Sequence, residues 1–147
     1  MTILFRKFQN TDKKEILSMM KVFYASDAVA TNGSEKIFSA DFDMCISDSE
    51  FLTGYTICKD DEIIGYSMIS KSFSTEFGKF CIWLEDLYLK PTFRGLGIIP
   101  KFISFIEKEH PNTVFKLEAE DENAHAIHVY SKQGFEKMPY CVMKKEL

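Results

Sequence analysis

Residues 80–89 (Phe-Cys-Ile-Trp-Leu-Glu-Asp-Leu-Tyr-Leu) constrain the fold more than any other segment. The run is mostly apolar and has the length of one strand, which predicts a central strand covered on both faces. Two adjacent carboxylates, Glu85 and Asp86, interrupt it. Charged side chains are rare inside a buried strand, so this pair marks the segment as a candidate site.

Patterns along the rest of the chain predict an α+β order of elements, with one segment in which the periodicity is unclear. Between residues 25 and 49 the periodicity blurs around Asn32-Gly33-Ser34, and we expect a loop with one further short helix there. No repeat or linker is present, so the chain of 147 residues predicts a single domain, 1–147. The other expected elements are a strand at 2–9, a helix after 10–12, a hairpin of strands 53–59 and 62–70, the strand 80–89, a helix at 100–109, a strand at 113–118, a helix at 123–132 and a final strand or pair at 135–144.

Composition excludes several classes of protein. Hydrophobic residues make up 46% of the chain, which is typical of a packed globule. A net charge of -4 argues against a nucleic-acid binder and slightly favours a cationic partner. No apolar run is long enough to cross a membrane, and residues 1–6 lack the order of a signal peptide, so we expect a cytoplasmic protein. Four cysteines without a C-x-x-C pair are expected to be buried, reduced thiols.

A glycine loop, Arg94-Gly95-Leu96-Gly97-Ile98-Ile99, joins the central strand to the next helix. Backbone N–H groups and the helix dipole converge at such a junction, which favours a bound phosphate. Glycines there allow close approach and positive φ angles. Pro100 stands where both a P-loop and a dinucleotide fingerprint need a glycine, so neither motif is present. By itself the loop is equally typical of a tight turn with a helix cap.

Three segments together resemble the GCN5-related N-acetyltransferase (GNAT) superfamily: 83–89, the loop 94–98, and Asn123 through Tyr130 to Gly134-Phe135. The likeness is close over the second half of the chain. It implies an α+β, three-layer fold with a central, mostly antiparallel, twisted sheet of 6–7 strands and about four flanking helices. It also implies a splay between the fourth strand (80–89) and the fifth (113–118).

The resemblance implies acetyl-CoA as co-substrate and no metal. Ile99 stands where the family prefers Gly or Ala. His125 and His128 lie three apart on one predicted helix but lack a third ligand, so we interpret them as surface residues. The implied cofactor-binding residues are Leu87, Tyr88, Leu89, Arg94, Gly95, Leu96, Gly97, Ile98, Ile99, Asn123, Ala126 and Lys132, although Asn123 also suits a helix N-cap.

The same resemblance assigns catalytic roles to Tyr130 and Glu85. Tyr130 is the expected acid for the departing thiolate, although an amphipathic helix residue would look the same. Glu85 is the expected base, with Asp86 as its rival and an ion-paired structural role as the alternative. Strand alternation predicts that the two carboxylates point to opposite faces unless a bulge turns one of them.

The expected reaction moves an acetyl group to a primary amine of a small molecule or a peptide, and the alternative is a non-catalytic CoA-binding regulatory domain. The acceptor site is expected between the stretch 25–49 and the hairpin around 73–77. The resemblance also allows a homodimer. The acidic side chains there that suit an amine are Asp27, Glu35, Asp41 and Asp43, and Phe38 and Phe42 suit the walls of such a site. The alternative is an ordinary acidic surface with the two phenylalanines as core anchors.

Overall fold

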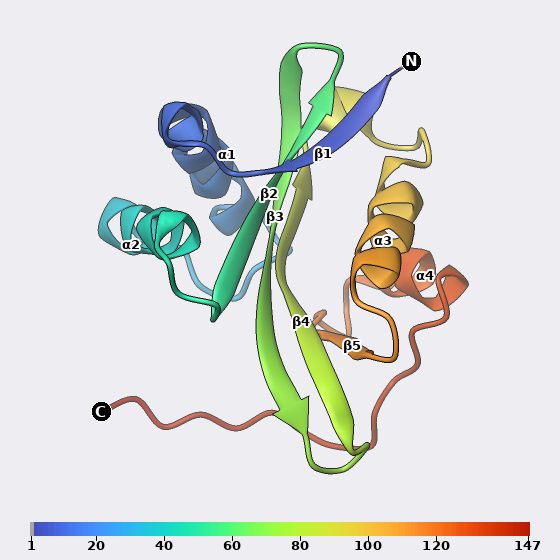
Figure 1. The fold of residues 1–147 in the computed structure, drawn as a ribbon. Coiled ribbons are helices and arrows are strands. Elements are labelled where there is room, and N and C mark those ends of the chain that lie inside the picture. Colours follow the sequence, from blue (N-terminus) through green and yellow to red (C-terminus); the bar gives the residue numbers. More distant parts are fainter. Residues whose placement is uncertain (1) are drawn as a thin grey trace.

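A computed structural model describes residues 2–147 as a sheet with helices on both faces (Figure 1). Five strands follow one another in space as in sequence: β1 (Ile3–Lys7), β2 (Leu52–Lys59), β3 (Glu62–Ser74), β4 (Lys79–Leu89) and β5 (Val114–Leu117). The first four pair antiparallel, and β5 pairs with β4 in parallel. The predicted mostly antiparallel sheet is therefore confirmed.

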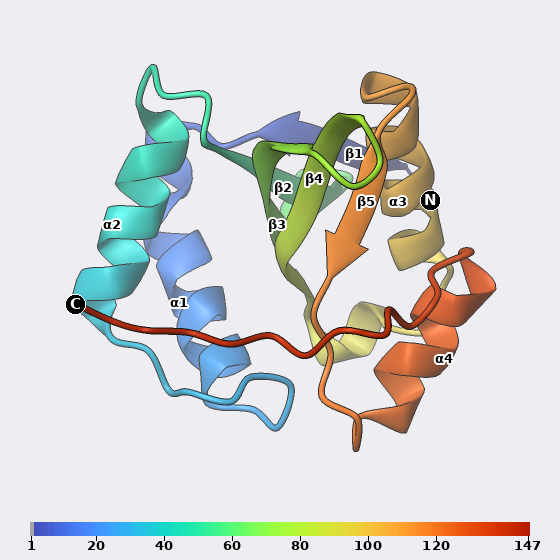
Figure 2. The same cartoon turned by 90° about the horizontal axis from the view of Figure 1, so that it is seen from below.

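Four helices cover the sheet in two layers (Figure 2). α1 (Lys13–Tyr24) and α2 (Glu35–Ile46) lie on one face, and α3 (Ile98–Glu109) and α4 (Ala124–Lys132) lie on the other. Short 3-10 turns, η1 (Asn10–Asp12) and η2 (Pro91–Phe93), precede α1 and the glycine loop. The predicted three-layer arrangement with about four helices is confirmed.

Separate apolar clusters pack on the two faces of the sheet. Toward α1 and α2, the side chains of Tyr66, Met68 and Tyr88 meet helix residues such as Met20 and Phe42. Toward α3, Ile69, Ile82 and Leu84 meet Phe102 and Ile106. These two sets decide which face each residue of β4 occupies, and so they locate the site.

The α2 helix is longer than the sequence suggested. It spans 12 residues, and the hydroxyl of Ser34 accepts from the N–H of Ile37 at 3.2 Å as an N-cap. Its stripe is thin, because Phe38 and Phe42 alone are fully buried. This is why its periodicity is weak in the sequence.

The expected final strand at 135–144 is wrong. Within residues 2–147 the sheet has five strands rather than 6–7, and the chain after α4 runs past the lower end of the sheet without joining it (Figures 1 and 2). A β-prone segment becomes a strand only when a sheet edge takes up its backbone hydrogen bonds. Cys141 in this segment is exposed, contrary to the expectation of four buried thiols.

Candidate active site

The glycine loop has the backbone that an anion site needs. Gly95 and Gly97 have φ angles of 78° and 76°, in the left-handed region. Added Cβ atoms at these two positions would meet nothing within 4 Å, so the conformation and not crowding requires glycine. Gly97 is the N-cap of α3, whose first N–H groups therefore open toward the loop.

Arg94 closes the base of this loop. Its Nε donates to the carbonyl of Leu89 at 3.0 Å, and its guanidinium lies 5.6 Å from the ring centroid of Tyr88. Ile99 is half-buried and packs with the apolar cluster of Ile57, Ile64, Leu89 and Ile98. The side chain of Ile99, where the family prefers Gly or Ala, thus packs against the edge of this cluster.

The pairing between β4 and β5 ends in the middle of β4. Their parallel pairing runs from Cys81–Val114 to Leu84–Leu117, where β5 ends. β4 continues to Leu89 and leads into the glycine loop. Beyond Leu84, the edge of β4 that faced β5 has no strand partner among residues 2–147, so its backbone groups are free to pair with an extended ligand. β4 thus has an open edge at the place where the resemblance implies a splay.

A bulge in β4 places both carboxylates on one face. Met68 pairs with Asp86 and Ile69 pairs with Leu84, so Glu85 is an extra residue in the ladder. Ile69 and Leu84 face α3, whereas Asp86 contacts Tyr66 on the α1/α2 face. Glu85 accepts from Ser70 at 3.1 Å, and Ser70 alternates with Ile69 along β3. Simple strand alternation therefore fails at Glu85, because the bulge that was named as the possible exception is present.

The two carboxylates differ in their surroundings. Asp86 is 3% exposed and accepts from two phenols, those of Tyr24 at 2.8 Å and Tyr66 at 2.7 Å. Burial raises the pKa of Asp86, and the phenols of Tyr66 and Tyr24 oppose that rise. Glu85 remains accessible to solvent. Desolvation raises the pKa of Glu85, the Ser70 hydroxyl opposes the rise, and Asp86 and Glu118 add to it.

α4 carries the remaining predicted residues and is loosely held. None of its described residues is fully buried, whereas α3 buries four. Tyr130 is half-buried with its ring 5.8 Å from that of Phe135, and burial raises its pKa. No partner among residues 2–147 hydrogen-bonds to the Tyr130 hydroxyl. A phenol in this state is protonated at neutral pH and can donate.

The helix N-cap predicted as one reading of Asn123 is present. Its Oδ1 accepts from the N–H of Ala126 at 3.2 Å at the start of α4. The amide NH₂ of Asn123 is left for another partner. Ala126 is half-buried and Lys132 is exposed in the last turn. The structure thus brings Arg94 and Gly95 together with the end of β4, and holds Asn123, Ala126 and Lys132 on the separate helix α4.

Of the acceptor-site candidates, Asp41 alone comes close to the paired carboxylates. Burial raises its pKa to about 6, with Asp86 and Glu85 adding to the rise. Asp43 instead pairs with Lys13 at 2.9 Å, while Asp27 and Glu35 are exposed. Phe38 and Phe42 are core residues. Phe73 and Phe77 are exposed near the turn between β3 and β4.

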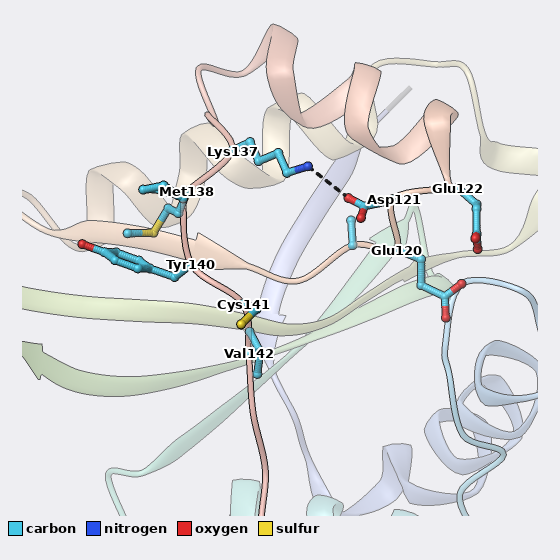
Figure 3. A pocket seen from close by; sticks show the side chains of 10 residues that line it. Glu120, Asp121, Glu122, Lys137, Met138, Tyr140, Cys141 and Val142 are labelled. Carbon is cyan, nitrogen blue, oxygen red and sulfur yellow. Dashed lines mark ion pairs between the residues drawn. The ribbon is translucent and has the colours of Figure 1, made fainter.

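A pocket of about 720 Å³ lies between the loop after β5 and the C-terminal segment (Figure 3). Glu120, Asp121 and Glu122 line one side. Lys137 on the other side reaches Asp121 at 3.5 Å, and Glu120 and Glu122 extend away from that pair. This acidic loop follows Glu118, which also acts on Glu85. Glu85 thus has Asp86 and Glu118 as acidic neighbours, while the Lys116 ammonium lies over the ring of Trp83, two residues before Glu85.

Among residues 2–147, no group of three or more His, Cys, Asp or Glu side chains is arranged to hold a metal ion, and His125 and His128 are exposed. Burial raises the pKa of the Cys45 thiol to about 12, which makes it a poor nucleophile. No helix within these residues is both long and apolar enough to span a bilayer.

Sequence reasoning missed Tyr24, Tyr66 and Glu118 as site residues. Tyr66 has the same strand parity as Met68, so its inward direction was readable, although its partner was not. Tyr24 ends α1, and nothing in the sequence linked it to a residue 62 positions later. Tertiary contacts assemble this part of the site.

The sequence profile of the acetyltransferase (GNAT) family matches residues 18–135. No curated protein sequence matches the chain significantly. The structure is similar to that of a possible acetyltransferase from Clostridium difficile 630, with a TM-score of 0.83 and 15% identity over 100% of this chain and 99% of that one.

Two further solved structures with the same fold have cofactor-like ligands. Aminoglycoside N-acetyltransferase AAC(6')-Iy, in complex with the bisubstrate analogue CoA-S-monomethyl-acetylneamine, has a TM-score of 0.79 at 15% identity, covering 100% of this chain and 99% of that one. A predicted acetyltransferase with acetyl-CoA from Clostridium acetobutylicum has a TM-score of 0.77 at 20% identity, covering 98% and 96%. At these identities the likeness establishes the fold.

Proposed function

Because the chain belongs to the acetyltransferase (GNAT) family, we propose that it transfers the acetyl group of acetyl-CoA to a primary amine of a small molecule or a peptide. One observation carries the proposal: the pairing of β4 with β5 ends at Leu84, and β4 leads through the short turn η2 to the glycine loop at the start of α3. An open strand edge beside a helix N-terminus suits a ligand with an extended amide arm and a pyrophosphate.

The cofactor would lie along this edge. Leu87, Tyr88 and Leu89 offer backbone groups to the pantetheine arm, and residues 94–99 offer N–H groups and the Arg94 charge to the pyrophosphate. Asn123, Ala126 and Lys132 on α4 border the same side of the sheet. The half-exposed packing of α4 lets this helix adjust to the cofactor.

Glu85 and Tyr130 supply the proton transfers. The amine nitrogen attacks the thioester carbon, an N–C bond forms and the C–S bond breaks, while a backbone N–H of β4 stabilises the developing oxyanion. Glu85 takes the proton that the ammonium group loses, and its raised pKa makes it a stronger base. Tyr130 donates its phenol proton to the departing thiolate. The attacking nitrogen carries a second proton, which leaves as the C–S bond breaks and returns to the Tyr130 phenolate, so charges and protons balance.

The acceptor is proposed to be cationic. Asp41 on α2, Glu85 on β4 and Glu118 after β5 act on one another or on Asp86, and each carries negative charge when ionised. Such a region concentrates cations and draws ammonium groups toward Glu85. This charge distribution supports an amine carried by a basic molecule over one carried by an acidic one.

The test is release of free thiol from acetyl-CoA in the presence of polyamines, amino acids, aminoglycosides and basic peptides. Aminoglycosides belong in the panel because AAC(6')-Iy, which shares the fold, is bound to an acetylneamine analogue. Turnover with at least one amine supports the proposal. Thermal stabilisation by CoA without turnover would instead identify the alternative, a non-catalytic CoA-binding regulatory domain. If CoA does not stabilise the protein and no amine gives turnover, both functions are rejected.

We propose that residues 1–147 act as one domain that forms a homodimer. The C-terminal segment exposes Tyr140, Val142 and Met143 at 64%, 71% and 88%. Exposed apolar side chains on a β-prone segment favour pairing with a second copy. Light scattering is expected to report a dimer, and Val142→Asp is expected to weaken it. A monomer at all concentrations would contradict this assembly.

A further inference from the structure

Asp86 accepts hydrogen bonds from hydroxyl groups on two elements of the fold. Tyr24 at the end of α1 donates to one carboxylate oxygen and Tyr66 on β3 donates to the other. The hydroxyl of Ser67 donates to the backbone carbonyl of Asp86 at 2.7 Å. Two elements, α1 and β3, therefore fix this residue in a buried position, and the proposed reaction uses none of the three hydroxyls.

Both phenols are permanent donors. Burial raises the pKa of Tyr24 and of Tyr66, and the charge of Asp86 raises each further. They stay protonated over any working pH, so each keeps donating to the carboxylate. Hydrogen bonds to an ionised carboxylate are stronger than those to a neutral acid. The two tyrosines thus favour the charged form of Asp86 against the cost of its burial.

Glu85 is in the opposite situation. Its side chain lies on the same face as Asp86 because of the bulge, yet it receives one hydrogen bond, from Ser70. The charges of Asp86 and Glu118 favour its protonated form. The groups that act on the two carboxylates are Tyr24 on α1, Asp41 on α2, Tyr66 and Ser70 on β3, and Glu118 after β5.

Two adjacent carboxylates with such different partners divide the roles of fixed charge and proton acceptor. We propose that Tyr24 is a positioning residue which, with Tyr66, holds Asp86 as a fixed negative charge beside Glu85 and so makes Glu85 the member of the pair that accepts the proton. The inference rests on the proposed acetyl transfer and deepens it. Neither tyrosine touches the reacting atoms in this account.

The placement of Tyr24 also links the base to the acceptor side. α1 ends at Tyr24, and the chain from there to Ser34 leads to the helix that carries Asp41. The ring of Tyr24 lies 5.2 Å from that of Phe38 on α2. A movement of the α1–α2 segment on acceptor binding would therefore reach Asp86 through the side chain of Tyr24.

The test measures the acidic limb of the pH profile of kcat/KM. Asp86→Asn removes the fixed charge, so the limb is expected to move to lower pH by about one unit. Tyr24→Phe lets Asp86 compete for the proton, and the limb is expected to move the same way by less. Tyr55→Phe, a buried phenol on the α3 face, is the matched control and should leave the limb in place. A merely structural role would lower activity without moving the limb.

A second measurement needs no turnover. Carbon-13 NMR titration of the Glu85 carboxyl group is expected to show a lower midpoint in Asp86→Asn and in Tyr24→Phe than in the unaltered chain. If the unaltered chain transfers no acetyl group, the proposed function fails while this titration still decides the pair. If Asp86→Asn does not fold, Tyr24→Phe and Tyr66→Phe carry the test. An unchanged Glu85 midpoint in the variants that fold would overturn the inference.

Discussion

The two faces of β4 are built by different means. On the α3 face, Leu87 and Leu89 pack into apolar clusters, and the glycine loop that follows is defined by the φ angles of Gly95 and Gly97. On the α1/α2 face, polar groups from α1, β3 and the bulge meet at Asp86. The first face depends on local sequence, and the second on contacts between distant segments. We therefore expect cofactor binding and proton removal from the amine to fail independently.

Glu85→Gln is expected to have the largest effect. Removal of a general base lowers kcat by about 10²- to 10⁴-fold, while the proposed cofactor edge of β4 is untouched, so the affinity for CoA should stay unchanged. The measurement is steady-state kinetics with calorimetric CoA binding. Glu118→Gln removes a neighbouring charge but no base, and it should cost less than about tenfold. Equal losses in the two variants would show that charge near β4, and not a base at Glu85, matters.

Tyr130→Phe comes next. Loss of a general acid is expected to lower kcat by about 10²-fold with little change in the free energy of unfolding, since the hydroxyl has no partner among the described residues. Tyr140→Phe is the matched control because its hydroxyl binds Glu76 on the surface at 2.8 Å. An unaltered maximal rate in Tyr130→Phe at every pH would remove Tyr130 from the mechanism.

Gly97→Ala is expected to break the cofactor face alone. Alanine in the left-handed region costs about 1–2 kcal/mol, and a loop that shifts to relieve this strain should bind CoA about tenfold more weakly. Gly78, in the turn between β3 and β4, has a φ angle of 66° and equally open surroundings. Gly78→Ala should lose similar stability and keep its CoA affinity. Parallel losses of affinity would mean that strain, and not loop geometry, is being measured.

Asp41→Asn is expected to have the smallest effect, on stability. The pKa of Asp41 is raised to about 6 in the folded protein, so its ionised form opposes folding above that pH. The penalty disappears as the pH falls below about 4, the value of an unfolded aspartate. Asp41→Asn should therefore raise the free energy of unfolding at pH 7–8 by on the order of 1 kcal/mol, with a matching rise in Tm. At pH 4 it should change neither. Asp43→Asn, exposed on the same helix, should give no gain.

The same contrast explains what the sequence could predict. The glycine loop and the N-cap at Asn123 are local features, and the residues that form each of them are adjacent in the chain. The bulge at Glu85 depends on the pairing of Met68 and Ile69, which no local pattern reports. The final strand was wrong because residues 140–143 have the propensity for a strand, but no sheet edge pairs with them within residues 2–147.

Amide NMR of the labelled chain during a CoA titration tests the central claim most directly. The account predicts shifts at Leu87–Leu89, at Gly95–Ile99 and at the start of α4, with Tyr24 and Asp41 unaffected. It then predicts that an amine acceptor shifts the amides of Tyr24 and Asp41 and not those of the cofactor-binding segments. Shifts from CoA that centre on α1 and α2, or none at the glycine loop, would contradict the division of β4 into a cofactor face and an acceptor face.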